Sequence, residues 1–164
     1  MGAAIPGLND AKYGLIAGPV FNISFAVMVL FTGSFADQYT RRFLLGFASV
    51  AWSLTSIGTA FSTTFAEVSA CRLLLGAFEA FTAPSCYSLI VDFFPLEERT
   101  LANAIFALGI SVGASISSLT VLIIGEIGWR DAYLILGIFG ISVGTLLMIV
   151  MREPKRGRFE IKNI

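Results

Sequence analysis

Two ionisable residues, Arg72 and Glu79, lie in a stretch that is otherwise uncharged from residue 70 to residue 91. Their spacing of seven residues places both side chains on one face of a helix. Counted back from Asp92 at 1.5 Å per residue, Glu79 lies roughly 20 Å from the end of the stretch and Arg72 about 30 Å. In a bilayer whose core is about 30 Å thick, Glu79 would lie near the midplane. A charge is costly to bury at that depth, so the pair is a candidate functional site.

Three roles are open for Glu79. It can contact the head group of a substrate, carry a proton, or belong to a structural ion pair. In the third case its partner would be Arg72 or a basic group on another helix, because long side chains can bridge the roughly 10 Å between the two backbones. Gly76 shares the face of the pair, which indicates close packing or a cavity there. We therefore take Arg72 and Glu79 as candidates for binding a substrate or a proton.

The elements that must position these residues are five apolar stretches, at residues 13–36, 43–66, 70–91, 100–125 and 132–151. Each is long enough to cross a hydrocarbon core as a helix. Charged residues make up 13% of the chain, about half their share in a soluble domain. Continuous apolar runs favour helices over the short alternating strands of a membrane barrel. The sequence therefore predicts an all-α, polytopic membrane bundle of five transmembrane helices in a single domain, surrounded by membrane lipids.

Basic residues gather after the first, third and fifth of these spans. They are Arg41, Arg42, Arg99, Arg152, Lys155, Arg156, Arg158 and Lys162. The positive-inside rule places those three segments in the cytoplasm. The cytoplasmic loop after the third span also holds Asp92 and Glu98, and Pro95 is expected to stop the helix before it. Its acidic pair, at positions 97 and 98, is available to the first turn of the next helix.

A compact group of glycine, acidic and basic residues follows the first span and comprises Gly33, Asp37, Arg41 and Arg42. Gly33 allows another helix to approach closely at the membrane edge. Asp37 can accept hydrogen bonds from neighbouring helix N-termini and pair with Arg41 or Arg42. The alternative is that the two arginines only fix the orientation of the chain in the membrane.

Several classes of protein are disfavoured by what the chain lacks. It has no histidine, so neither a Ser-His-Asp triad nor an H-E-x-x-H zinc site is possible, and it has no nucleotide-binding G-x-x-x-x-G-K-[ST] loop. Cys71 and Cys86 lie roughly 22 Å apart on one predicted helix, too far for a disulfide. The net charge of zero gives no sign of a nucleic-acid partner. We therefore expect no enzyme, no metal and no cofactor.

The segment from Gly33 to Arg42 resembles the loop signature of the major facilitator superfamily, G-x-L-a-D-R-x-G-R-R. The pattern Asp37-x-Tyr-x-Arg41-Arg42 is similar to the spinster branch of that superfamily. Arg72 through Ala80 resembles the branch's R-x-x-x-G-x-G-E-A, with Phe78 where glycine is usual. The segment R-E-P-K-R-G at residues 152–157 resembles its helix exit, and Asp92 falls at the expected distance. The five spans then correspond to helices two to six of a twelve-helix transporter, and residues 4–6 resemble the end of helix one.

The resemblance implies a secondary transporter that works by alternating access. Gly33, Asp37, Arg41 and Arg42 would form a conformational latch, released when the two lobes rock. The spinster branch implies an amphipathic substrate such as a lysolipid or sphingolipid, whose head group meets Arg72 and Glu79. In a eukaryote it implies a lysosomal or plasma membrane. Partners would be the missing half of the transporter or a full-length relative. The competing hypothesis is a truncated, non-transporting protein that associates with such a relative.

Small residues recur every four positions on the fourth span, at Gly109, Gly113 and Ser117. We expect close helix packing along this stripe, and the same for Gly137, Gly140 and Gly144 on the fifth span.

Overall fold

The computed structural model describes residues 14–159 and contains one π-helical turn and six α-helices. Their order along the chain is η1 (Ile16–Val20), α2 (Phe21–Gln38), α3 (Arg41–Phe61), α4 (Phe65–Glu79), α5 (Thr82–Phe93), α6 (Arg99–Ile127) and α7 (Trp129–Val150). Five helical segments are long and apolar enough to cross a membrane, with α4 and α5 together forming one of them. The predicted all-α bundle of five transmembrane helices is confirmed. The start of the first span at Tyr13, residues 4–6 and Lys162 lie outside the described residues.

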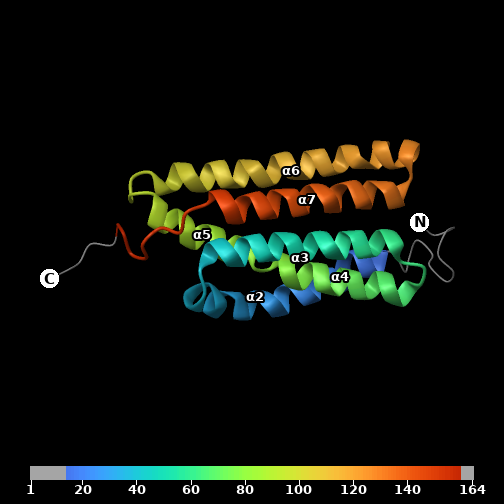
Figure 1. Cartoon of the computed structure of the whole chain (residues 1–164), viewed down its shortest axis with the longest axis horizontal. Coiled ribbons are helices and arrows are strands. Elements are labelled where there is room, and N and C mark those ends of the chain that lie inside the picture. Colours follow the sequence, from blue (N-terminus) through green and yellow to red (C-terminus); the bar gives the residue numbers. More distant parts are fainter. Residues whose placement is uncertain (1–13, 160–164) are drawn as a thin grey trace.

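The helices run side by side along the long axis of the molecule (Figure 1). The α2–α3 turn, the α5–α6 loop and the tail after α7 lie at one end, and the α3–α4 and α6–α7 turns lie at the other. We call the first of these ends the basic end, because its turns and tail carry Arg41, Arg42, Arg99, Arg152, Lys155, Arg156 and Arg158. The grouping of basic segments that the sequence predicts is therefore seen in the structure.

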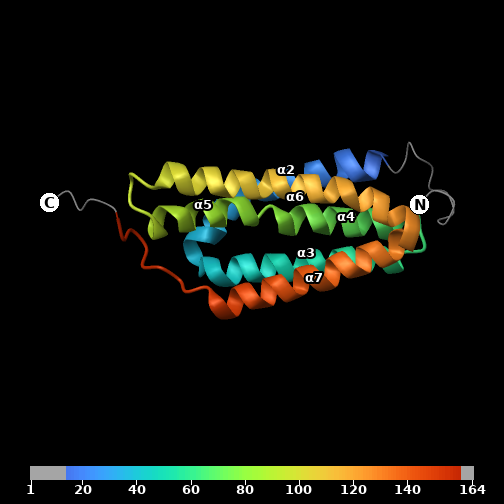
Figure 2. The same ribbon diagram turned by 90° about the horizontal axis from the view of Figure 1, so that it is seen from above.

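Helices α3 and α7 form the closest pair in the bundle, and both views show them adjacent (Figures 1 and 2). Glycines on both helices allow this approach. A Cβ atom added to Gly144 would lie 2.8 Å from the Cβ of Ser49, and additions at Gly137 and Gly140 would meet Ile57 and Ser53. The packing role expected for these three glycines is confirmed.

The third span differs from the expected continuous helix. It begins at Phe65 and is interrupted at Ala80 and Phe81 between α4 and α5. Pro84 accounts for the interruption, because proline lacks the N–H that would bond the carbonyl of residue 80 and its ring collides with that carbonyl. Glu79 is therefore the last residue of α4, placed directly at the break.

The boundary between the second and third spans also differs from expectation. Helix α3 ends at Phe61 rather than near residue 66. The Thr64 hydroxyl caps α4 by accepting a hydrogen bond from the Glu67 N–H, and the Glu67 carboxylate accepts one from the Thr64 N–H. This T-x-x-E capping box is visible in the sequence, so it was a usable signal for the start of the helix.

Helix α6 has little covering from the rest of the described chain. None of its described side chains is buried. Space for a Cβ atom at Gly109 and Gly113 is open, with no atom within 4 Å. The close packing expected along this stripe is therefore absent between the described helices, and Gly113 and Ser117 line a groove instead.

Candidate functional site

A groove of about 640 Å³ runs between α3, α4, α6 and α7 and contains Glu79. Its walls are mainly apolar, with three serines on α3 and a glycine-containing face on α6. The lining residues are Ser49, Trp52, Ser53, Ser56, Glu79, Ile110, Gly113, Ala114, Ser117, Leu136, Phe139, Gly140 and Val143. Glu79 is the only charged group among them.

Glu79 is half-buried, and the described residues supply it with no ion pair or hydrogen bond. Its position at the end of α4 follows from the break that Pro84 introduces. A carboxylate that has no protein partner and faces a groove can bind a proton or the polar group of a ligand. This arrangement fits the first two roles considered for Glu79, and residues 14–159 supply no structural ion pair for it.

Arg72 lies on α4, towards the end of the bundle opposite the basic end, and its side chain is directed to α7. It donates a hydrogen bond to the hydroxyl of Tyr133, and its Cζ lies 5.4 Å from the centroid of the Tyr133 ring. The Arg72 Nε is buried with no hydrogen-bond partner in the described part of the chain. Arg72 and Glu79 thus form no ion pair with each other, and a tyrosine that the sequence did not single out holds the arginine.

Substituting Tyr133→Phe removes the hydroxyl that binds Arg72 and keeps the aromatic face. We expect the free energy of unfolding in detergent to fall by about 1 kcal/mol, the usual scale for such a bond in a membrane protein. The matched control is Tyr87→Phe, because the Tyr87 hydroxyl has no hydrogen bond within residues 14–159. Equal stability of both variants in thermal or denaturant unfolding would contradict this role.

A cluster of charged residues lies at the basic end and is built around Arg41. Arg41 opens α3, and its Nη1 lies 2.5 Å from Oδ2 of Asp92 at the end of α5. Its Nε lies 3.0 Å from Oε1 of Glu153 in the tail, and Nη1 also donates to the Ser88 hydroxyl at 2.8 Å. The side chains of Arg41 and Asp92 are only 3% and 6% exposed. This buried pair therefore ties α3 to α5 and to the tail.

The tail after α7 completes the cluster with backbone contacts. Glu153 accepts from the Arg42 N–H at 2.9 Å, and Asp92 accepts from the Gly157 N–H at 2.9 Å. Arg156 donates to the carbonyls of Ala36, Asp37 and Tyr39 at the end of α2. A guanidinium at a helix C-terminus satisfies free carbonyls and complements the negative end of the helix dipole.

The structure corrects parts of the predicted latch. Asp37 forms no ion pair with Arg41 or Arg42 among the described residues, and only its backbone carbonyl binds an arginine, Arg156. It does line a small cavity of about 230 Å³ with Arg41, Ser88, Asp92 and Arg156. Gly33 is exposed, with open space around it and no described helix against it.

The three residues predicted for the cytoplasmic loop have different positions and contacts in the structure. Asp92 is buried at the end of α5 and belongs to the Arg41 cluster rather than to the loop. Arg99 caps α5, since its side chain donates to the carbonyls of Val91 and Phe94. Glu98 precedes α6 but makes no side-chain capping bond. The contributions of Glu153 and Arg156 were missed, although the R-E-P-x-R-G segment that contains them was noted.

The five membrane-crossing helical segments define a polytopic membrane protein. The sequence profile of the Major Facilitator Superfamily matches residues 4–163. The chain belongs to this superfamily.

Individual relatives agree with this assignment. The chain is 29% identical over 157 residues to Protein spinster homolog 1 of Homo sapiens, matching 93% of this chain and 30% of the relative. It is 28% identical to the Sphingosine-1-phosphate transporter SPNS2 of Danio rerio, over 92% of this chain and 30% of the relative. The Gallate transporter of Pseudomonas putida is 27% identical, over 92% of this chain and 33% of its own length. The chain thus spans about a third of the length of these relatives.

A solved structure gives the same result for the fold. A bacterial homolog of the human lysosomal transporter Spinster, in an inward-facing and occupied conformation, superimposes with a TM-score of 0.82 at 27% identity. The match covers 94% of this chain and 39% of that one. The predicted resemblance to the N-terminal part of spinster-like major facilitator proteins is confirmed, and the protein is a multi-pass membrane protein.

Proposed function

We propose that this chain is part of a secondary active transporter that moves an amphipathic small molecule by alternating access. The observation that carries the proposal is Glu79, which lies at the break between α4 and α5 and lines an otherwise uncharged groove. Its carboxylate has no ion pair or hydrogen bond within the described part of the chain. Transporters of many folds form their substrate and ion sites at interrupted helices near the membrane midplane. Glu79 would bind a proton or a polar head group, and Arg72 would contribute positive charge nearer the opposite end.

The apolar walls of the groove support a lipid-like substrate. Ile110, Leu136, Phe139 and Val143 offer hydrocarbon surface around a single carboxylate. A relative is named for sphingosine 1-phosphate, which combines a long chain with a charged head group. Another is named for gallate, a small anion, so the same fold serves different solutes. We infer an amphiphile such as a sphingolipid or lysolipid, carried across a lysosomal or plasma membrane.

The latch role proposed for Gly33, Asp37, Arg41 and Arg42 has partial structural support. Arg41 and Arg42 belong to the network that joins α2, α3, α5 and the tail at the basic end. Open space at Gly33 leaves α2 accessible to the second lobe of a transporter. We propose that this network keeps the basic end rigid while the two lobes move, on what we infer to be the cytoplasmic side.

A second candidate function is supported by the exposure of α6. A 29-residue helix without buried side chains among those described needs further protein or lipid to cover it. The chain would then associate with the missing transporter half, or with a full-length relative, and would not transport alone.

Uptake assays separate these functions. Proteoliposomes containing the polypeptide in its native length, or the 164-residue chain alone, would be given labelled sphingosine 1-phosphate or labelled gallate. Uptake above empty liposomes by the native polypeptide supports transport, and a preference for the sphingolipid supports an amphiphilic substrate. Absence of uptake together with co-purification of a longer homologue supports the association function. The mass of the native polypeptide in membranes decides which of the two chains is physiological.

A further inference from the structure

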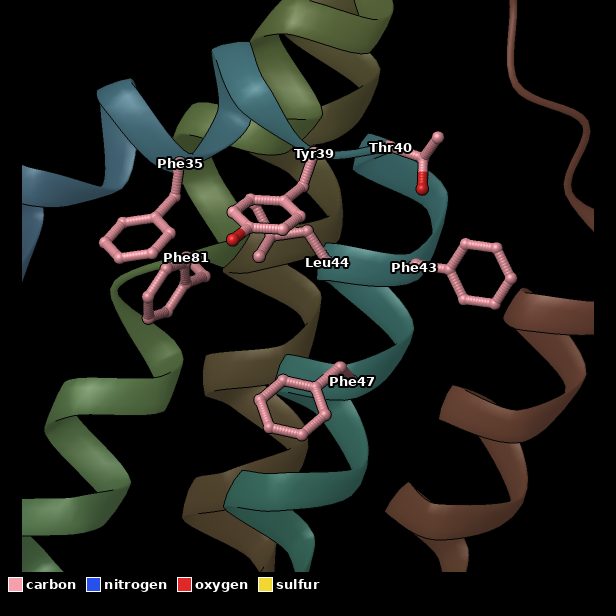
Figure 3. A pocket seen from close by; sticks show the side chains of 7 residues that line it. All are labelled: Phe35, Tyr39, Thr40, Phe43, Leu44, Phe47 and Phe81. Carbon is pink, nitrogen blue, oxygen red and sulfur yellow. The ribbon is translucent and has the colours of Figure 1, made fainter.

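A hollow of about 470 Å³ lies at the basic end between α2, α3 and the α4–α5 break (Figure 3). Its lining residues are Phe35, Tyr39, Thr40, Phe43, Leu44, Phe47 and Phe81. We call it the aromatic pocket, because five of these seven residues are phenylalanine or tyrosine. None of them lines the groove around Glu79, so the two hollows are separate sites.

The break in the third span shapes the aromatic pocket. Phe81 lies in the break, where Figure 3 shows it turned towards Phe35 and Tyr39. Its ring meets Phe35 edge to face at a centroid distance of 5.7 Å, and Phe35 stacks on Tyr39 at 6.1 Å. Phe47 on α3 is in edge contact with Phe78 at 6.0 Å. These contacts hold Phe35, Tyr39 and Phe81 together along one wall of the hollow.

The aromatic pocket lies at the depth of lipid chains close to the head groups. Arg41 opens α3 at the basic end, and Phe47 follows it by six residues, or about 9 Å along the helix axis. The face of α3 that holds Phe43 and Phe47 continues as Leu54 and Phe61, and all four side chains are at least half exposed. An exposed apolar stripe along a membrane-crossing helix is suited to contact with lipid.

The positive charge of Arg42 lies beside the aromatic pocket. The Cζ of Arg42 lies 4.9 Å from the centroid of Phe43, which lines the pocket. The Arg42 guanidinium donates one hydrogen bond to the Met151 carbonyl but forms no ion pair within residues 14–159. Arg41, by contrast, has two carboxylate partners. Arg42 therefore presents uncompensated charge next to a hydrocarbon-lined space.

We propose that the aromatic pocket binds one acyl chain of an anionic membrane phospholipid, whose phosphate is bound by Arg42. The pocket supplies apolar contact for the chain, and the arginine supplies the charge that selects an anionic head group. This lipid is a resident of the membrane leaflet at the basic end and is distinct from the solute proposed for the Glu79 groove. The inference does not depend on the proposed transport function.

Photolabelling in lipid nanodiscs tests the proposal directly. The native-length polypeptide would be labelled with phosphatidylglycerol or phosphatidylcholine that carries a diazirine on one acyl chain, and the labelled peptides would be mapped by mass spectrometry. We expect label in the segments of residues 35–47 and 78–81. Phosphatidylglycerol should label these segments more strongly than phosphatidylcholine does. Arg42→Gln should lower the ratio of labelling by phosphatidylglycerol to labelling by phosphatidylcholine about five-fold. This factor corresponds to about 1 kcal/mol per basic residue at an anionic surface.

Arg158→Gln is the matched control, because Arg158 also lies at the basic end and stacks on a phenylalanine, Phe159, at 5.2 Å. It should leave the ratio unchanged. The ratio is measured within each variant, so differences in folding yield cancel. The proposal is overturned by label spread evenly to Leu54 and Phe61, by equal labelling from both lipids, or by an unchanged ratio in Arg42→Gln. It is also overturned if the pocket is unlabelled because protein covers it.

Discussion

The variant Arg41→Ala is expected to lose about 3–5 kcal/mol of unfolding free energy, the largest stability effect of any side chain at the basic end. The reason is the state in which the substitution leaves Asp92. This carboxylate is 6% exposed and lies 2.5 Å from the Arg41 guanidinium, so its charge has little access to water once the arginine is removed. Unfolding in detergent by denaturant or heat measures the loss.

Two comparisons isolate the buried pair. Arg42→Ala removes a neighbouring arginine that has no ion pair in the described chain, and its cost should stay below about 1 kcal/mol. Combining Arg41→Met with Asp92→Asn removes both charges, while the asparagine still accepts from the Gly157 N–H. The double variant should be more stable than Arg41→Ala, because the deeply buried side chain at position 92 then carries no charge. Equal losses for Arg41→Ala and Arg42→Ala would show that the pair is not what stabilises the basic end.

Hydropathy was sufficient to predict the five membrane-crossing helices, since the apolar length required by a bilayer is a strong constraint. Two local details were available but not used. The Thr64–Glu67 capping box marks the start of α4, and Pro84 marks the interruption that follows Glu79. Each depends on a few neighbouring residues and is weaker than the apolar pattern that surrounds it.

For the candidate site too, some residues could be predicted from the sequence and others could not. Charges inside apolar spans are visible in any sequence, which is why Arg72 and Glu79 could be selected. The partners of the arginines could not be predicted, because Tyr133 lies 61 residues from Arg72 and Glu153 lies 112 residues from Arg41 along the chain. Such contacts are set by how the helices pack. The stripe at Gly109 and Gly113 shows the converse, since small residues permit close approach but do not identify the helix that approaches.

The substitution Glu79→Gln is expected to have the largest effect on transport. Glutamine keeps the size and hydrogen-bonding capacity of the side chain but can neither ionise nor release a proton, so a role in charge or proton transfer is removed with little change in packing. We expect uptake by the native-length polypeptide to fall at least about ten-fold, equivalent to about 1.4 kcal/mol, and its dependence on pH to flatten. Initial rates of uptake between acidic and neutral pH measure both.

The matched control for this substitution lies on the same helix. Glu67→Gln also neutralises a glutamate of α4, but that residue caps the helix near its start and does not line the groove. Glutamine can replace glutamate in a capping box, so this variant should transport as well as the parent protein. A loss shared by both variants would point to a general effect on α4. Uptake by Glu79→Gln that equals that of the unmodified protein at every pH would exclude Glu79 from the mechanism, because none of the other described residues that line the groove is charged.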